Sequence, residues 1–217
     1  MIVYMTDRGK YFSIADALSC GLETPRGLYI NLTNRCDNDC VFCLRRTKEM
    51  MRGSSLWLER EPTVEEVIDE LRAVRWSAVS EVVFCGFGEP TLRLKELLEI
   101  LKWIRENHAG VSTRLNTNGL GELAHGREIA LEFEGLLDVA SISLNASTAE
   151  KYYALTRSSY GGGAFEAMLT FAEHMKKFVP SVVLTIVDKV SPPEEIERCR
   201  ELCSARKLKL RVRPFET

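Results

Sequence analysis

The chain has 217 residues, of which 45% are hydrophobic and 28% charged, and its formal net charge is −2. This balance is typical of a folded globular protein and excludes a global attraction to nucleic acid or to acidic membranes. No apolar run approaches the ~18 residues of a membrane span, and charged residues follow the first few positions, so we expect neither a membrane anchor nor a signal peptide. Seven cysteines, three of them clustered, favour a reducing compartment, and we expect a cytoplasmic protein.

The first part of the chain predicts a hairpin followed by a core strand. Residues 1–14 form the expected hairpin, with its turn at residues 7–10. Leu28 to Leu32 is an apolar run that predicts the first core strand. The polar segment with the clustered cysteines follows this strand directly.

The rest of the chain alternates between helix-like and strand-like segments. A capping box at Thr63 and Glu66 opens the first of the predicted helices, and Pro192-Pro193 opens the last. Further helices are expected at residues 94–104, 120–133 and 165–172, and further strands at residues 81–85, 113–117, 139–144, 182–187 and 208–212. Six strands that alternate with helices predict an α/β fold with a parallel sheet.

Three cysteines with spacings of four and three residues are the main functional signal. Cys36, Cys40 and Cys43 lie among asparagines and aspartates that favour turns, which argues against a buried helical stripe. Structural zinc is a weaker alternative, because zinc sites usually have four ligands and all three histidines are far away in the sequence. Three cysteines fit an iron–sulfur cubane with one iron open to another ligand.

A second motif follows a strand-like segment. Cys85-Gly86-Phe87-Gly88-Glu89-Pro90 comes directly after Glu81-Val82-Val83-Phe84. Together with the cysteine loop it resembles the radical S-adenosylmethionine (SAM) superfamily. In that family the three cysteines hold a [4Fe-4S] cluster, SAM binds the fourth iron, and a Gly-Gly-Glu-Pro turn lines the methionine amino group. Phe87 stands where the family usually has its first glycine.

The resemblance implies an incomplete (βα)6 TIM-like barrel, the radical SAM core, with a short N-terminal hairpin extension. We expect one domain over residues 1–217, with the extension at 1–26 and the partial barrel at 27–217. In βα barrels the chemistry lies at the C-terminal ends of the strands, and each motif here follows a strand.

The resemblance also implies a set of SAM-binding residues. Phe42 is expected near adenine or in the core. Val187 or Asp188 is expected near adenine, with burial in the barrel as the alternative for Val187. Ser143 and Asn145 are expected at the ribose or as a helix cap before Ala149. The cofactor-binding candidates are Phe42, Gly86, Phe87, Gly88, Glu89, Asn116, Ser143, Asn145 and Val187, and the metal ligands are Cys36, Cys40 and Cys43.

Several arginines are candidates for the remaining chemistry. The polar residues expected to face the barrel mouth are Arg114, Asn116, Asn118, Arg157, Arg211 and Arg213, and several arginines together suit a carboxylate or a phosphate. Basic residues also outnumber acidic ones around the cysteine loop, namely Arg35, Arg45, Arg46, Lys48 and Arg52. Such a loop would attract an acidic electron donor or would simply be solvated.

Over nearly the whole chain the sequence resembles most closely the TatD-associated radical SAM proteins, named for genes near a TatD-type nuclease. The superfamily resemblance implies reductive cleavage of SAM to a 5′-deoxyadenosyl radical, hydrogen abstraction from an unidentified substrate, and a flavodoxin or ferredoxin as electron donor. Because the barrel is short, we expect a sizeable substrate or a partner to cover its open side. The subfamily resemblance implies a link to nucleic-acid or tRNA metabolism, by association alone. The alternatives are a 7-carboxy-7-deazaguanine synthase-like enzyme, an iron–sulfur electron carrier and a zinc-binding module.

Overall fold

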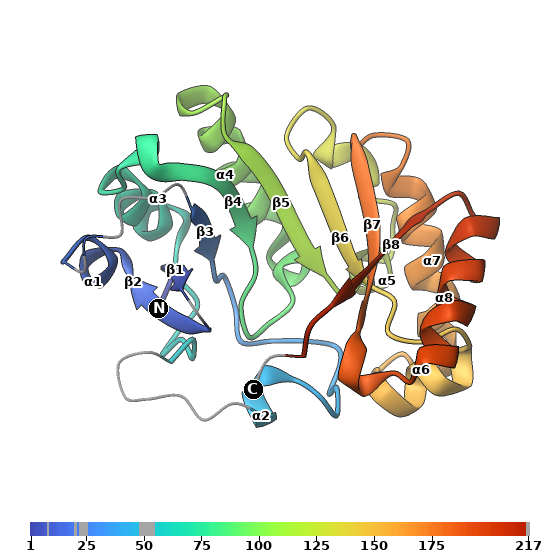
Figure 1. Cartoon of the computed structure of the whole chain (residues 1–217). Helices are drawn as coiled ribbons and strands as arrows, with labels where there is room; N and C mark the ends of the chain where they lie inside the picture. Colours follow the sequence, from blue (N-terminus) through green and yellow to red (C-terminus); the bar gives the residue numbers. More distant parts are fainter. Residues whose placement is uncertain (8, 20, 22–25, 48–54, 216–217) are drawn as a thin grey trace.

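A single curved sheet organises the structure. The computed structural model describes residues 1–7, 9–19, 21, 26–47 and 55–215. Eight strands pair in the order β2-β1-β3-β4-β5-β6-β7-β8, so β2 and β8 are edges and the sheet does not close (Figure 1). The strands are β1 (Val3–Asp7), β2 (Lys10–Ser13), β3 (Arg26–Ile30), β4 (Val79–Phe84), β5 (Ser112–Thr117), β6 (Val139–Ser143), β7 (Ser181–Val187) and β8 (Lys209–Arg213).

The predicted parallel sheet is confirmed. Strands β3 to β8 pair in parallel, each with its neighbour in sequence. The predicted hairpin β1–β2 adds to this sheet, because β1 pairs antiparallel with β3. The result is the expected α/β partial barrel of six parallel strands, extended on one edge by the hairpin.

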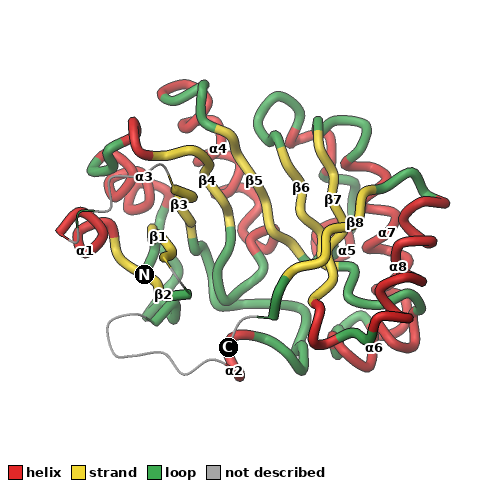
Figure 2. The backbone as a smooth tube through the Cα atoms, viewed as in Figure 1, coloured by secondary structure: helices red, strands yellow, loops and turns green. Residues whose placement is uncertain are grey.

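Most of the helices connect consecutive parallel strands and cover one face of the sheet (Figure 2). The helices are α1 (Ile14–Ser19), α2 (Leu44–Thr47), α3 (Val64–Arg72), α4 (Leu94–Asn107), α5 (Gly121–His125), α6 (Ala149–Thr156), α7 (Ala164–Met175) and α8 (Pro193–Ala205). The capping box predicted for α3 is present, with Thr63 and Glu66 each bonded to the other's backbone N–H. None of the helices within the described residues is both long and apolar enough to cross a lipid bilayer.

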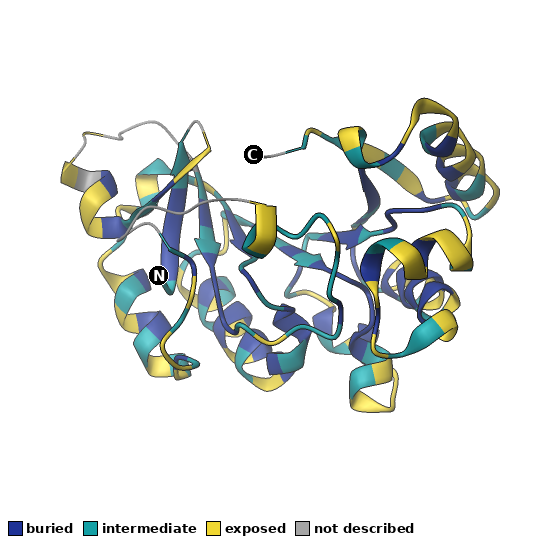
Figure 3. Cartoon of the chain, turned by 90° about the horizontal axis from the view of Figure 1, so that it is seen from below, coloured by how far each residue is buried: buried dark blue, intermediate teal, exposed yellow. Residues whose placement is uncertain are grey.

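The two faces of the sheet differ in chemistry. Alternate strand residues point to opposite faces, and one set, which includes Phe84, Leu115 and Leu184, is fully buried in the core with the helices. Figure 3 shows this buried layer between the strands and the outer, exposed helix surfaces. The other set lies on the concave face and includes arginine, asparagine, serine and threonine. The core therefore lies on the helix side of the sheet, and the concave side is left for polar groups.

One helix prediction was wrong. A helix was expected over residues 120–133, but α5 ends at His125 because Gly126 adopts a left-handed conformation with φ of 62°. The chain resumes only as a short 3₁₀ turn at Ala130–Phe133. The sequence prediction also lacked α1, α2 and α6. The first core strand ends at Ile30, two residues earlier than expected, although the N–H of Asn31 still donates to the carbonyl of Ile2 on the hairpin side at 2.8 Å.

A buried carboxylate joins α8 to the start of α6. Glu195, 4% exposed, accepts hydrogen bonds from the backbone N–H of Ser147 at 2.7 Å and from its hydroxyl at 2.6 Å. Lys151 and Arg198 form ion pairs with the same side chain. Burial raises the pKa of Glu195, but these partners outweigh it and lower the pKa to about 2.

We predict that Glu195→Gln lowers the free energy of unfolding by about 2 kcal/mol at pH 7, because the buried carboxylate that accepts these hydrogen bonds is replaced by an uncharged amide. A depressed carboxylate pKa stabilises the fold above its ordinary value of 4.5, and this contribution is lost as the pH falls toward 2. Urea denaturation should therefore show a smaller difference between variant and wild type at acidic pH. Glu197→Gln is the matched control, because Glu197 is exposed and pairs with Arg200. Equal losses in the two variants would contradict the prediction.

Candidate functional site

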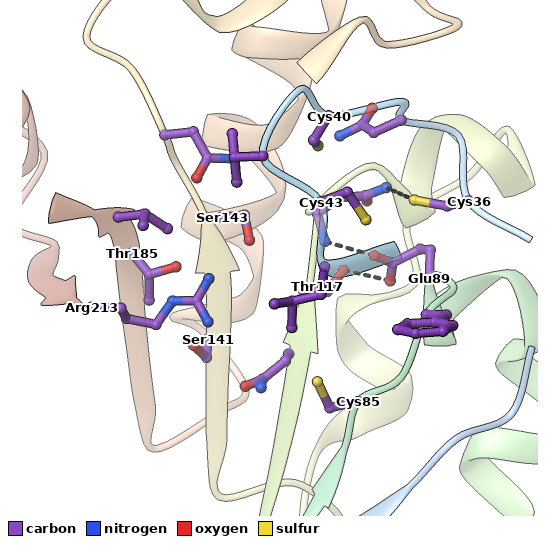
Figure 4. A pocket seen from close by; sticks show the side chains of 18 of the residues that line it. Cys36, Cys40, Cys43, Cys85, Glu89, Thr117, Ser141, Ser143, Thr185 and Arg213 are labelled. Carbon is purple, nitrogen blue, oxygen red and sulfur yellow. Dashed lines mark hydrogen bonds between the residues drawn. The ribbon is translucent and has the colours of Figure 1, made fainter. Parts of the chain in front are cut away.

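A cavity of about 220 Å³ lies at the C-terminal ends of the parallel strands (Figure 4). The three clustered cysteines lie on one side, and Ser141, Ser143, Thr185 and Arg213 on the other. All twelve candidates from the sequence line this cavity: Cys36, Cys40, Phe42, Cys43, Gly86, Phe87, Gly88, Glu89, Asn116, Ser143, Asn145 and Val187. The fold thus brings together residues that are up to 151 positions apart, the difference between 187 and 36.

The cysteine loop is held in place by the end of α6. The backbone N–H of Asp39 donates to the carbonyl of Thr156 at 2.8 Å, and that of Val41 donates to Leu155 at 2.9 Å. These carbonyls belong to the last turn of a helix and have no partner within it. At the other end of the loop, the N–H groups of Arg46 and Thr47 donate to the carbonyl of Cys43 and begin α2.

The three thiols are partly buried, and Cys36 and Cys40 are unfavourable to ionise on their own. Burial, followed by the charge of Glu89, raises the pKa of Cys36 to about 11. Burial and the two neighbouring thiols raise the pKa of Cys40 to about 12. Iron cations would compensate the thiolate charges that the protein leaves unbalanced. Among the described residues, no three His, Cys, Asp or Glu side chains converge on one point where they could hold a single metal ion. The three thiols instead line a cavity, and this donor set fits an iron–sulfur cluster.

The turn after β4 packs tightly against the chain that leads into the cysteine loop. A Cβ at Gly88 would lie 2.3 Å from the carbonyl oxygen of Thr33 and 2.5 Å from that of Arg35. A Cβ at Gly86 would lie 2.0 Å from Oδ1 of Asn31. The N–H of Glu89 also donates to the carbonyl of Arg35 at 2.7 Å. Glycine is required at Gly88 because the two segments are in direct backbone contact, and at Gly86 because the side chain of Asn31 occupies the place of a Cβ.

Phe87 replaces the family's usual glycine for a packing reason. Its side chain is 6% exposed and joins a small apolar cluster with Tyr4, Tyr11 and Leu56. The ring of Trp57 meets it edge to face at 5.2 Å between centroids. Tyr4 further supports the turn, because its hydroxyl donates to the carbonyl of Cys85 at 3.1 Å. The β1–β2 hairpin thus supports the turn after β4.

Glu89 connects the turn to the end of β5. Its Oε1 accepts hydrogen bonds from the hydroxyls of Thr91 at 2.8 Å and Thr117 at 2.7 Å, and its Oε2 accepts one from the N–H of Asn118 at 2.7 Å. Burial raises the pKa of Glu89, and these donors oppose that effect. The side chain of Glu89 therefore mainly connects the turn after β4 to the end of β5.

The candidates on the later strands lie where sequence periodicity places them. Ser143 and Asn116 are on the concave face, and Asn145 follows β6 with φ of 61°. The helix-cap alternative for Ser143 and Asn145 was wrong, because Thr148 caps α6 and accepts from the N–H of Lys151. Val187 is 7% exposed and Phe42 is partly buried, so each side chain both packs and lines the cavity.

Sequence reasoning missed part of the lining. The additional residues are Asn38, Leu44, Cys85, Thr117, Ser141, Thr185, Pro214 and Phe215, and Asn118 and Arg213, expected at the barrel mouth, join them. Ser141 and Thr185 were detectable, because they share a face with Ser143 and Val187 at a spacing of two. One candidate for the mouth was wrong: Arg157 caps α6 in a left-handed conformation, more than half exposed, with its guanidinium 4.0 Å from Asp39.

The basic residues around the cysteine loop are partly neutralised. Arg35 pairs with Glu61 at 2.6 Å, and Arg46 pairs with Asp39. Arg45 lies 6.0 Å from the ring centroid of Trp57. Lys48 and Arg52, which belong to the same sequence prediction, lie outside the described residues. The excess positive charge around the described part of the loop is therefore smaller than composition suggests.

Comparison with known proteins identifies the family. The profile of the Radical SAM superfamily matches residues 30–203. The chain belongs to the radical SAM superfamily. It is 31% identical over 184 residues to a GTP 3′,8-cyclase of Corynebacterium glutamicum, covering 80% of this chain and 46% of that protein. It is also 31% identical over 159 residues to a probable GTP 3′,8-cyclase of Thermococcus kodakarensis, covering 73% of this chain and 46% of that one. The chain thus spans about half the length of these relatives.

Solved structures agree on the fold. Streptococcus suis SuiB bound to S-adenosylmethionine superposes with a TM-score of 0.63 at 18% identity, covering 89% of this chain and 40% of SuiB. Methylornithine synthase gives 0.62 at 15% identity, covering 92% and 56%. Proteins of the radical SAM superfamily, to which the chain belongs, are enzymes that use a [4Fe-4S] cluster and SAM and require a reductant. The electron-carrier and zinc-module alternatives are thereby left without support.

We predict that Gly88→Ala disrupts the site, because the new Cβ meets backbone carbonyls that cannot move away cheaply. The expected results are a loss of about 2 kcal/mol in the free energy of unfolding and less iron bound per chain after reconstitution. The measurements are urea denaturation and iron analysis. Gly110→Ala is the matched control, because a Cβ there meets nothing within 4 Å. A variant at Gly88 that binds iron like the control would refute the packing argument.

Proposed function

We propose that Cys36, Cys40 and Cys43 ligate three irons of the [4Fe-4S] cluster and that SAM occupies the cavity beside them. One observation carries this proposal: three thiols and the turn at residues 86–89 line a single cavity at the strand ends. With one electron from the reductant, SAM bound to such a cluster supplies methionine and a 5′-deoxyadenosyl radical, which takes a hydrogen atom from the substrate.

The protein's own residues bind, orient and shield SAM in this proposal. The turn at residues 86–89 receives the methionine end of SAM next to the cysteines. Ser143 and Asn145 face the ribose, and Phe42 and Val187 contact adenine through their apolar side chains. Glu89 keeps the turn in position through its bonds to Thr117 and Asn118 rather than by proton transfer. These contacts exclude water from the reacting atoms.

We further propose that the enzyme is of the TatD-associated type and that it acts on a sizeable substrate. Its motifs at residues 28–36, 83–90 and 211–215 support the first part. The cavity supports the second, because Cys40, Phe42 and Arg213 line it while partly exposed, so it is not enclosed. A link to nucleic-acid or tRNA metabolism rests on association. The electron donor is a flavodoxin or ferredoxin in this proposal.

The decisive test is SAM cleavage. Protein purified and reconstituted without oxygen, reduced with dithionite and supplied with SAM should form 5′-deoxyadenosine. Cys36→Ala, Cys40→Ala and Cys43→Ala should each abolish it, because the cluster loses a ligand. Product is quantified by chromatography, and iron and sulfide are measured in parallel.

Cys199→Ala is the matched control, because Cys199 is a fully buried thiol on α8 that does not line the cavity. This variant should keep both its iron and its SAM cleavage. Cleavage that persists in the Cys36, Cys40 and Cys43 variants would overturn the ligand assignment. Wild-type protein that takes up zinc but neither iron nor sulfide would overturn the proposed function itself.

A further inference from the structure

The concave face of the sheet is unusually polar for a barrel interior. In closed βα barrels this space is filled by layers of branched apolar side chains. Here the inward positions of β5 and β6 carry Arg114, Asn116, Ser141 and Ser143, while β8 presents two arginines. A polar interior of this kind is stable when a polar ligand or water occupies it.

Three arginines lie on this face, Arg114 on β5 and the other two on the edge strand β8. Arg211 and Arg213 are two residues apart on β8, so they share a face and lie ~7 Å apart along the strand. The guanidinium of Arg211 donates to the hydroxyl of Ser141 at 3.1 Å. Figure 4 shows Arg213 extending from β8 toward Ser141 of β6. Burial, followed by the positive charges of Arg114 and Arg213, lowers the pKa of Arg211, so both of the other arginines act electrostatically on it.

The positive charge of this cluster is incompletely balanced. Among the residues that the structure describes, Glu81 is the one carboxylate paired with any of the three arginines, and it bonds Arg114 at 2.7 Å. Three cations and one anion leave a net charge of +2. Nε of Arg114, Nε of Arg213 and Oδ1 of Asn116 are buried and have no hydrogen-bond partner within the described part of the chain. Buried polar groups are normally satisfied, so these atoms mark places for ligand or water contacts.

We propose that Arg114, Arg211 and Arg213 bind an oxyanion group of the substrate, a phosphate or a carboxylate. The planar guanidinium fork matches the geometry of either group, and an anion between the arginines relieves their mutual repulsion. This inference rests on the proposed function, because it places the substrate beside the SAM cavity. It restricts the substrate to an acidic molecule whose anionic group lies deeper in the partial barrel than the atom that loses hydrogen.

The carboxylate of SAM is a competing occupant for one member of the cluster. Arg213 lines the cavity, whereas Arg211 lies one inward step nearer the N-terminal end of β8 and does not. A site for the SAM carboxylate would depend on Arg213 alone. A substrate oxyanion site depends on Arg211 as well, so Arg211 separates the two occupants.

The test is calorimetric titration of the cluster-loaded, SAM-bound enzyme with sodium pyrophosphate and, separately, with sodium malonate. We expect at least one of these probes to bind the wild type, and Arg211→Gln and Arg213→Gln each to weaken that binding roughly tenfold or more. Arg211→Gln should leave SAM affinity unchanged. Arg200→Gln is the matched control, because it removes the same charge from an exposed position on α8.

The probe that binds with the higher affinity identifies the anionic group of the substrate as a phosphate or a carboxylate. Binding of neither, or equal weakening in Arg200→Gln, would overturn the proposal. A loss of SAM affinity in Arg211→Gln that matches the loss in Arg213→Gln would also overturn it in favour of the SAM carboxylate. Arg211 is exposed on an edge strand, so the variant is expected to fold, and its thermal midpoint verifies this. 5′-Deoxyadenosine formation is measured separately, so failure of anion binding with intact SAM cleavage leaves the proposed function standing.

Discussion

Direct backbone contact between two loops is the constraint on which the site depends. The turn after β4 and the segment that enters the cysteine loop touch at Gly88 so closely that no side chain fits between them. Glu89 then fixes the same turn to the end of β5 through buried hydrogen bonds. Because these contacts join three strand ends, the position of the cysteines relative to the SAM turn is set by the sheet itself. A site assembled this way is precise without a closed barrel around it.

Short-range sequence patterns were sufficient to predict most of the fold. The six parallel strands follow from apolar segments of strand length, and α3 follows from its capping box. The expected helix at residues 120–133 failed because an apolar stripe does not reveal that Gly126 leaves the right-handed conformation. Helix α6 was missed because few of its residues are apolar on one face, and only Tyr152 and Thr156 are buried.

The candidate site, like the fold, could be predicted only where local sequence patterns reveal it. Both motifs were visible because the chemistry requires their residue types at fixed spacing. The packing role of Phe87 could not be predicted, because it depends on contacts with Tyr4 and Trp57, which are distant in sequence. The pairing of Arg114 with Glu81, and the absence of any such partner for Arg211 in the described part of the chain, likewise depend on strand register. Tertiary contacts of this kind are not encoded in any local pattern.

The attachment of the cysteine loop to the last turn of α6 links two parts of the molecule that seem independent in sequence. The carbonyls of Leu155 and Thr156 are satisfied by the loop, so this helix end and the loop open or close together in local unfolding. The free energy that binding of the proposed cluster would release on ordering the loop would be shared with α6, and through Glu195 with α8. Oxidative loss of the proposed cluster would therefore affect more of the structure than the cysteine loop. It would loosen α6 and its attachment to α8, which would expose the damaged chain to proteolysis in preference to the intact one.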